Sequence, residues 1–326
     1  MSSDTPNTLT SKVLVLEPSP AHREAIGAFC QLNQLQAHKV LAENILSVLA
    51  SNIDLGAIFL PEKMGEDAHA GRTLGQRIHA LRPELPLFLR TESQASADEM
   101  PAGERACFAA LYTLETLHTL VPAVQQSIFT LAYPGALVRG IAEIARNAFA
   151  SQFKGMRLEI DPPYIVRDRL IFGEVFSLIP IESDWCRGFM TLQTEEAALE
   201  RLVRTDRTYL AAADADDFRG LNGLLGELTN LIWGAFKNRY EQQQALQAAR
   251  SQVPIVINHL HRYISFGSTD PQLCLRCTLH APDDAAFAPV VVYLRFVFSL
   301  NWSPDAFREN DLTAESLVAC GDLELF

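Results

Sequence analysis

The first part of the chain alternates short, almost continuously apolar runs with segments of helical spacing. Apolar runs at residues 12–17, 37–41, 55–60, 85–90 and 106–112 predict five strands, because strands buried on both faces carry few polar residues. The segments 21–35, 42–51, 73–81 and 117–131 have the spacing of amphipathic helices. This alternation predicts an α/β doubly wound parallel sheet over residues 12–131, preceded by a flexible polar tail at residues 1–11.

The pattern changes at residues 132–135, where Pro134 and Gly135 break the helical spacing and mark a domain boundary. Helices are predicted at residues 136–153 and 194–203, the second with Thr194 as its N-cap. Strands are predicted at residues 157–160, 164–169, 170–181, 189–193, 253–264, 273–279 and 290–299. The last strand alternates only weakly, so we expect it at the centre of its sheet. Residues 135–326 are therefore predicted to form an α+β domain with an antiparallel sheet and long helices.

One predicted helix, over residues 220–235, contains four glycines, at positions 220, 223, 226 and 234. Each glycine inside a helix is less favourable than alanine by roughly 1 kcal/mol. Such residues are kept where a neighbouring element or a partner must come close to the backbone. On a helical wheel, one broad apolar side predicts the face that packs on the core: Phe218, Leu221, Leu225, Leu228, Leu231, Ile232 and Phe236.

Glu227 and Asn230 fall on the outer face of this helix, three residues apart, where their side chains are neighbours. Gly223 and Gly234 lie on the same face, one turn before and one turn after the pair. The face therefore offers a carboxylate and an amide with little side-chain bulk around them. The alternative is an ordinary solvated surface, because exposed Glu and Asn are common.

Composition narrows the classes of partner. The chain has 326 residues, of which 48% are apolar and 20% are charged, as in globular proteins of about two domains. A net charge of −12 argues against a nucleic-acid partner and against docking on an anionic membrane surface. No run approaches 18 apolar residues, so membrane insertion is not expected. Six scattered cysteines predict reduced thiols and a cytoplasmic protein.

The order and lengths of the elements in residues 12–131 resemble the receiver domain of response regulators. That family has an acidic pair after strand one, a phosphorylated Asp at the end of strand three, Thr or Ser after strand four and Lys after strand five. Here only Glu17 follows strand one, Pro61 ends strand three, and Thr113 follows strand five, while Thr91 matches the hydroxyl after strand four. Because Mg²⁺ needs carboxylate oxygens, the resemblance implies the receiver fold without phosphorylation, a pseudo-receiver.

Three carboxylates, Glu62, Glu66 and Asp67, lie in the loop after the third predicted strand. We interpret them as solvated surface charge rather than as a displaced acidic site, since exposed loop carboxylates are the norm.

Residues 132–300 resemble the CheX, CheC and FliY family of chemotaxis-type phosphatases, and CheX most. The glycine-bearing helix reads Glu227-Leu-Thr-Asn230, and Pro254 follows 24 residues after Asn230. The family signature is Glu, two residues, Asn, and a Pro a little over twenty residues on. Gly223 departs from the family, which often has Asp or Ser at that position.

CheC-like members of the family carry a second Glu-x-x-Asn in the opening helix. Here that helix has Glu143 and Arg146, and Asn147 is displaced by one residue. The resemblance therefore implies one active pair, as in CheX.

The resemblance implies hydrolysis of the aspartyl phosphate of a partner, a phosphorylated receiver protein. Asn230 would orient the attacking water, because an amide both donates to and accepts from water, and Glu227 would contact the partner's active-site cation. Gly223 and Gly234 would let the helix enter the partner's cleft, and Pro254 would shape the turn into the sheet. The reaction mainly needs positioning, with Mg²⁺ already bound in the partner, so we expect no cofactor on this chain.

Other interpretations stay open. The chain could be a non-catalytic adaptor that binds receivers through the same helix. If the receiver-like domain covers Glu227 and Asn230, it could act as an autoinhibitory plug that mimics the substrate. The resemblance also implies a homodimer.

Metal and ligand motifs elsewhere are weak. Cys274 and Cys277 have metal-like spacing, but residues three apart in a strand face opposite sides. His259 and His261 share a strand face without a third ligand. Trp302 and Tyr263 are interpreted as core or interface residues.

Overall fold

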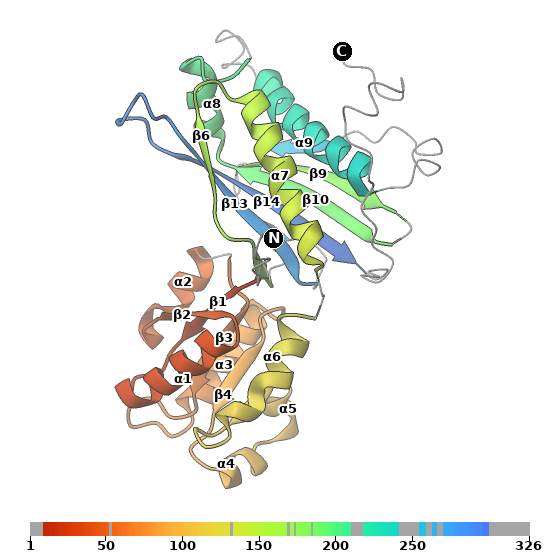
Figure 1. Ribbon diagram of the computed structural model, residues 1–326. Coiled ribbons are helices and arrows are strands. Elements are labelled where there is room, and N and C mark those ends of the chain that lie inside the picture. The colour runs from red at the N-terminus through yellow and green to blue at the C-terminus, as the bar shows by residue number, and fades with distance from the viewer. Residues whose placement is uncertain are drawn as a thin grey trace, which may run out of the picture.

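The computed structural model describes residues 9–51, 54–130, 133–167, 170–172, 174–183, 185–209, 218–240, 254–258, 263–265 and 270–299. These residues form two large sheets, each with its own helices (Figure 1), and one small two-stranded sheet. No helix among them is long and apolar enough to cross a bilayer.

The first sheet is parallel and has five strands in the order β2-β1-β3-β4-β5. Its strands are β1 (Ser11–Val15), β2 (Leu35–Lys39), β3 (Ala57–Pro61), β4 (Leu87–Arg90) and β5 (Ala110–Tyr112). All four neighbouring pairs are parallel. This is the flavodoxin-like order of doubly wound folds, so the predicted fold class of this part is confirmed.

Helices flank this sheet as α1 (Pro20–Leu32), η1 (Ala42–Asn44), α2 (Ile45–Ser51), α3 (Ala70–Leu81), α4 (Gln94–Asp98), α5 (Ala102–Arg105), η2 (Leu117–Leu120) and α6 (Val121–Ser127). Successive strand residues enter different cores: Val13 and Phe59 pack in one cluster, and Leu14 and Ile58 in the other. This is the alternation expected of a strand buried on both faces. The sequence did not predict α4 and α5, because helices of four or five residues are too short to show a period.

The second sheet is antiparallel and runs β11-β9-β10-β14-β13-β6, with β7 also pairing with β13. The strands are β6 (Arg157–Ile160), β7 (Tyr164–Val166), β9 (Val175–Glu182), β10 (Arg187–Thr194), β11 (Ile255–Asn258), β13 (Gln272–His280) and β14 (Val290–Ser299). β14 lies between β10 and β13, as its weak alternation predicted. Two predicted strands are each divided, since β8 (Leu170–Phe172) and β12 (Tyr263–Ser265) separate from β9 and β11 and pair with each other.

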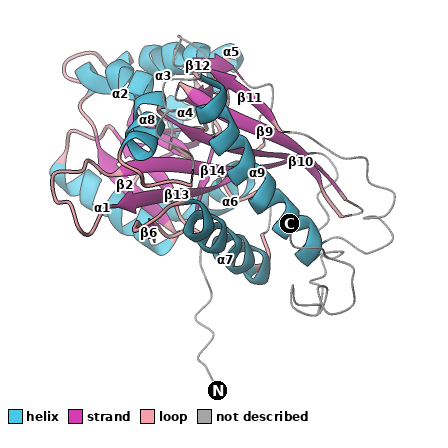
Figure 2. Ribbon diagram, turned by 90° about the horizontal axis from the view of Figure 1, so that it is seen from above, coloured by secondary structure: helices cyan, strands magenta, loops and turns pink. Residues whose placement is uncertain are grey.

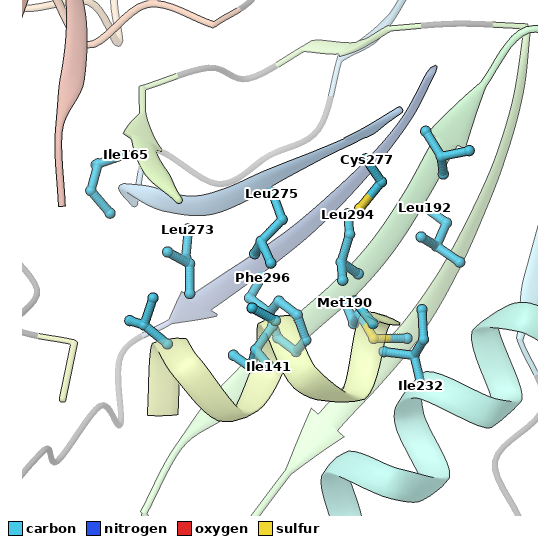
Figure 3. Packing of buried hydrophobic residues seen from close by; sticks show 14 of the residues in the cluster. Ile141, Ile165, Met190, Leu192, Ile232, Leu273, Leu275, Cys277, Leu294 and Phe296 are labelled. Atoms are coloured by element: carbon cyan, nitrogen blue, oxygen red, sulfur yellow. The ribbon is translucent and has the colours of Figure 1, made fainter. Parts of the chain in front are cut away.

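Three helices complete this domain: α7 (Gly135–Gln152), α8 (Glu196–Arg204) and α9 (Phe218–Tyr240). α7 and α9 pack together over one face of the sheet (Figure 2). Between them and the strands, Ile141, Ile232, Met190 and Phe296 form part of a continuous apolar core (Figure 3). Where the helices approach, a Cβ on Gly140 would lie 1.8 Å from Tyr240 Oη, so a larger residue there would displace the Tyr240 ring from its place between α7 and α9.

The predicted N-cap of α8 is wrong. Glu195 occupies that position and makes no side-chain cap hydrogen bond. The Thr194 hydroxyl instead donates to the Val291 carbonyl oxygen at 2.8 Å. The Thr194 hydroxyl, which the local sequence predicted to cap α8, therefore bonds to β14 instead.

Backbone hydrogen bonds join the two domains at β7. The Ile165 N–H donates to the Thr10 carbonyl oxygen at 2.8 Å, and the Ser11 hydroxyl donates to the Ile165 carbonyl oxygen at 2.8 Å. The Arg167 N–H donates to the Leu55 carbonyl oxygen, also at 2.8 Å. The edge of the second sheet is thereby held against β1 and the segment that leads into β3.

Candidate functional site

The long helix α9 is amphipathic, as its sequence predicted. Of the predicted inner side chains, Leu221, Leu225, Leu228, Ile232 and Phe236 are nearly inaccessible to solvent. They pack against β9, β10 and β11. Leu231 is half-buried, and the side chain of Phe218 lies outside the described ones. Burial of this side fixes which face of the helix points outward.

A buried polar contact fixes the rotation of α9 further. The Thr229 hydroxyl donates to the Leu225 carbonyl oxygen at 2.7 Å and contacts the Ser177 hydroxyl of β9 in a short hydrogen bond. Thr229 and Ser177 are both fully buried. Because Thr229 stands between Glu227 and Asn230 in sequence, its anchoring toward the sheet directs those two side chains away from it.

Glu227 and Asn230 are both exposed on the outer face of α9. Gly223 is exposed on the same face, and Gly234 is half-buried. A Cβ built on either glycine meets no atom within 4 Å. The low-bulk surround predicted from the wheel is thus present on both sides of the pair.

Neither Glu227 nor Asn230 makes a side-chain hydrogen bond or ion pair with the part of the chain that the structure describes. The exposed Glu143 of α7 is different, because Arg239 of α9 donates to its carboxylate at 2.8 Å. The α9 pair is therefore available to an external partner, whereas the carboxylate of the displaced α7 motif is already engaged.

The receiver-like domain does not cover the α9 pair, since both side chains are exposed in the whole chain. The interpretation of that domain as an autoinhibitory plug is therefore wrong for this arrangement of the two domains.

Pro254 lies directly before the edge strand β11 and is half-buried. Val256, two residues after Pro254, faces α9, and its Cγ2 would lie 3.8 Å from a Cβ built on Gly226. Pro254 thus leads into the strand that supports the middle of α9. The segment between α9 and Pro254 lies outside the described residues.

The interpretation of Glu62 as solvated charge is wrong, whereas Glu66 and Asp67 are exposed as expected. Glu62 is 1% exposed and forms an ion pair with Arg72 of α3. Glu17, after β1, is also buried and pairs with Arg90 of β4. The local sequence pattern could not predict these ion pairs, because each arginine lies in a different element from its glutamate.

Thr91, the residue that matches the receiver hydroxyl, is also buried. Its Oγ1 donates to the Tyr112 carbonyl oxygen at 3.3 Å. The hydroxyl is therefore engaged in joining β4 to β5.

The cysteines of the Cys274-x-x-Cys277 motif face opposite sides of β13, as predicted. Cys274 packs with Tyr164 and Val166, while Cys277 belongs to the main core. Burial raises the pKa of both thiols to about 12. Among the described residues, no group of three or more His, Cys, Asp or Glu side chains is placed to hold a metal ion.

Several side chains that the sequence singled out are not described. His259, His261 and Trp302 lie outside the described residues, and for Tyr263 the structure describes only its place in β12.

Comparison with known proteins finds similarity at the level of structure. No protein-family model matches the sequence, and no curated protein matches it. The second part of the chain is similar to the chemotaxis protein CheX from Desulfovibrio desulfuricans, with 14% identity and a TM-score of 0.37 over 50% of this chain and 98% of that one. It is also similar to CheX from Vibrio vulnificus, with 15% identity and a TM-score of 0.34 over 49% of this chain and 98% of that one.

The first part of the chain is similar to a response regulator receiver domain protein from Clostridium thermocellum. The identity is 13% and the TM-score 0.32, over 36% of this chain and 93% of that one. The chain thus joins a parallel sheet of order β2-β1-β3-β4-β5 to an antiparallel sheet with long helices.

Proposed function

We propose that this chain is a two-component signalling protein that hydrolyses the aspartyl phosphate of a partner receiver, using the outer face of α9. The observation that carries the proposal is the pair of exposed, unengaged side chains, Glu227 and Asn230, with open space at Gly223 and Gly234. The Glu-x-x-Asn sequence and the position of Pro254 supply the family setting.

The chemistry needs little from this chain beyond positioning. In the proposed complex, the Asn230 amide accepts from and donates to a water molecule and holds it in line with the phosphorus. The Glu227 carboxylate pairs with a cation in the partner's active site, which fixes the register of the two proteins. In the proposed complex Mg²⁺ is bound by the partner, and no metal or cofactor is expected on this chain.

The experiment measures loss of label from a phosphorylated candidate receiver of the same organism. Addition of the wild-type chain is expected to accelerate the loss, and Asn230→Ala is expected to lower the accelerated rate about 10²-fold, because a misplaced water forfeits most of the positioning effect. Glu227→Gln is expected to weaken association with the receiver.

Asn147→Ala is the matched control, because Asn147 is an exposed asparagine on the neighbouring helix α7. It is expected to retain the wild-type rate. Equal rates for Asn230→Ala and the wild type would exclude the catalytic role. Binding to the phosphorylated receiver without any change in phosphoryl lifetime would identify a non-catalytic adaptor instead.

We further propose that the chain forms a homodimer in the cytoplasm, as its sequence resemblance to CheX implies. Light scattering across micromolar concentrations measures the mass directly. A monomeric mass throughout that range contradicts the dimer.

A further inference from the structure

The carboxyl edge of the parallel sheet contains a polar cluster centred on Glu62. Glu62 directly follows β3, and its side chain is 1% exposed. In folds with this strand order, ligands bind outside the carboxyl ends of the strands, where β1 and β3 diverge. A charged group of the chain itself therefore occupies an edge that such folds leave open to ligands.

Three residues donate hydrogen bonds to the Glu62 carboxylate. Arg72 Nε donates to Oε1 at 2.7 Å, and its Nη2 makes a shorter contact with the same oxygen. The Glu92 N–H donates to Oε2 at 3.1 Å. The Ser96 hydroxyl lies 2.6 Å from Oε1 and 2.8 Å from Oε2. Both carboxylate oxygens are satisfied, in the way a bound anion is satisfied by a guanidinium, a hydroxyl and a backbone N–H.

The donors come from two segments that Glu62 joins. Arg72 lies in the first turn of α3, while Glu92 and Ser96 lie in the β4–α4 segment. Arg72 Nη2 also donates to the Ser96 carbonyl oxygen at 3.0 Å, so the two segments contact each other through the same guanidinium. Glu62 thus accepts hydrogen bonds from both segments and holds α3 and α4 next to the end of β3.

The start of α3 has no freedom to move away from this edge. The Gly71 N–H donates to the Glu62 carbonyl oxygen at 2.9 Å, and a Cβ on Gly71 would lie 1.8 Å from the Pro61 carbonyl oxygen. Backbone and side-chain contacts of Glu62 therefore act together on α3.

A second ion pair closes the neighbouring part of the edge. Arg90 Nε donates to Glu17 Oε2 at 2.8 Å, and Arg90 Nη1 donates to Glu92 at 3.0 Å. Glu92 contacts both pairs, since its N–H donates to Glu62 and its carboxylate accepts from Arg90.

We propose that Glu62 is an internal anionic ligand, which permanently fills the anion position formed by Arg72, Ser96 and the Glu92 N–H and holds α3 and α4 in one arrangement. The receiver-like domain is then a fixed element rather than a switch, because the position that an external anion would take is already occupied. This inference is independent of the proposed activity of α9.

The test removes the internal anion and offers a small one in its place. Glu62→Ala is expected to lower the melting temperature of the full chain by about 5 °C or more, because it leaves Arg72 buried without its carboxylate. Sodium formate at tens of millimolar is expected to restore part of the loss, and sodium chloride at the same ionic strength is not. Glu66→Ala, an exposed carboxylate four residues away, is the control and is expected to change little.

The double variant Glu62→Ala with Arg72→Ala is expected to lose the formate response, since the guanidinium is the main anion-binding group. If Glu62→Ala is unfolded in buffer, recovery of its circular dichroism signal on addition of formate supports the proposal, and absence of recovery overturns it. If formate raises the melting temperature of Glu62→Ala no more than chloride does, the proposal is also overturned.

Glu62→Gln provides a folded test, because the amide keeps the shape and loses the charge. Hydrogen exchange in residues 92–98 is expected to become at least tenfold faster, with α1 unchanged. An unchanged exchange rate in residues 92–98 overturns the proposal that Glu62 holds α4 in place.

Discussion

Asp54 and Arg295 form a buried ion pair between the two domains, with Arg295 Nη2 3.5 Å from Asp54 Oδ1. Asp54 precedes β3 of the parallel sheet and is 6% exposed, while Arg295 lies in the central strand β14 of the antiparallel sheet and is 1% exposed. Lys12 Nζ lies 3.7 Å from the other carboxylate oxygen and 4.9 Å from the centre of the Tyr164 ring. The positive charge of Arg295 at the centre of the antiparallel sheet is thus compensated by the Asp54 carboxylate of the other domain.

We expect Arg295→Met to destabilise the chain by about 3 kcal/mol, because it removes a fully buried partner of Asp54. Denaturant unfolding followed separately by fluorescence and circular dichroism measures the loss and shows whether the domains still unfold together. Asp54→Asn combined with Arg295→Met is expected to be less destabilised than Arg295→Met alone, since the double variant removes both buried charges of the pair and leaves only the partly exposed Lys12.

Arg276→Met is the matched control for this pair. Arg276 lies on the adjacent strand β13, and its ion pair with Asp161 at 3.2 Å is about one-third exposed at both side chains. A loss of at most about 1 kcal/mol is expected there. Equal losses for the two arginine variants contradict a special role for the pair between the domains.

The contact between Thr229 and Ser177 makes a second prediction. Thr229→Val keeps the shape of the side chain but deprives the buried Ser177 hydroxyl of its partner, which costs about 1–3 kcal/mol. Thr229→Val with Ser177→Ala removes both polar groups and is expected to recover much of the loss. Chemical denaturation of Thr229→Val, Ser177→Ala and the double variant measures the coupling, and a loss in the double variant equal to the sum of the two single losses would refute it.

Local patterns predicted most of the elements and the outer face of α9. A strand buried on both faces and a helix with one apolar side are determined by residues close in sequence, so the five parallel strands and the exposure of Glu227 and Asn230 follow from spacing alone. The role of that face in catalysis stays a prediction, because spacing describes where side chains point and not what they bind.

Features that depend on distant partners could not be predicted. Glu62 looks like loop charge until Ser96, 34 residues later, approaches it. Thr194 looks like an N-cap until Val291, 97 residues later, accepts its hydroxyl. In each case a tertiary hydrogen bond overrides the local preference of a polar side chain.

The buried position of Glu62 also predicts how stability depends on pH. Desolvation raises the pKa of Glu62, but the hydrogen bonds from Ser96, the Glu92 N–H and Arg72, together with the charge of Arg72, outweigh it and lower the pKa below its ordinary value. A lowered folded-state pKa gives stability that is present above the unfolded value of about 4.3 and is lost as the pH falls through the folded value.

The difference in unfolding free energy between the wild type and Glu62→Gln is therefore expected to be largest near pH 7 and to shrink below about pH 4.3. Urea unfolding at a series of pH values measures it. His69, whose Nδ1 lies 3.6 Å from Glu62 Oε1, and Glu104, 3.9 Å from Arg72 Nη1, also face the cluster. The same comparison in a His69→Gln background removes the contribution of the His69 side chain, and a difference that stays constant with pH contradicts the prediction.

Gly223 gives the most direct test of whether α9 must enter a partner. A Cβ at this position meets open space, so Gly223→Leu is expected to stabilise the free chain by roughly 0.5–1 kcal/mol through its higher helix propensity. The same substitution adds bulk beside Glu227, and we expect it to raise the KM for the phosphorylated receiver at least tenfold with a smaller change in kcat. The melting temperature of Gly223→Leu is therefore expected to rise while its kcat/KM falls, and thermal unfolding and dephosphorylation kinetics measure the two effects.

Gly27→Leu is the matched control, because Gly27 lies inside α1 of the receiver-like domain and a Cβ there also meets nothing within 4 Å. It is expected to stabilise the chain similarly and to leave KM unchanged. If Gly223→Leu is more stable and retains the wild-type KM, the glycine is not an entry point for the partner.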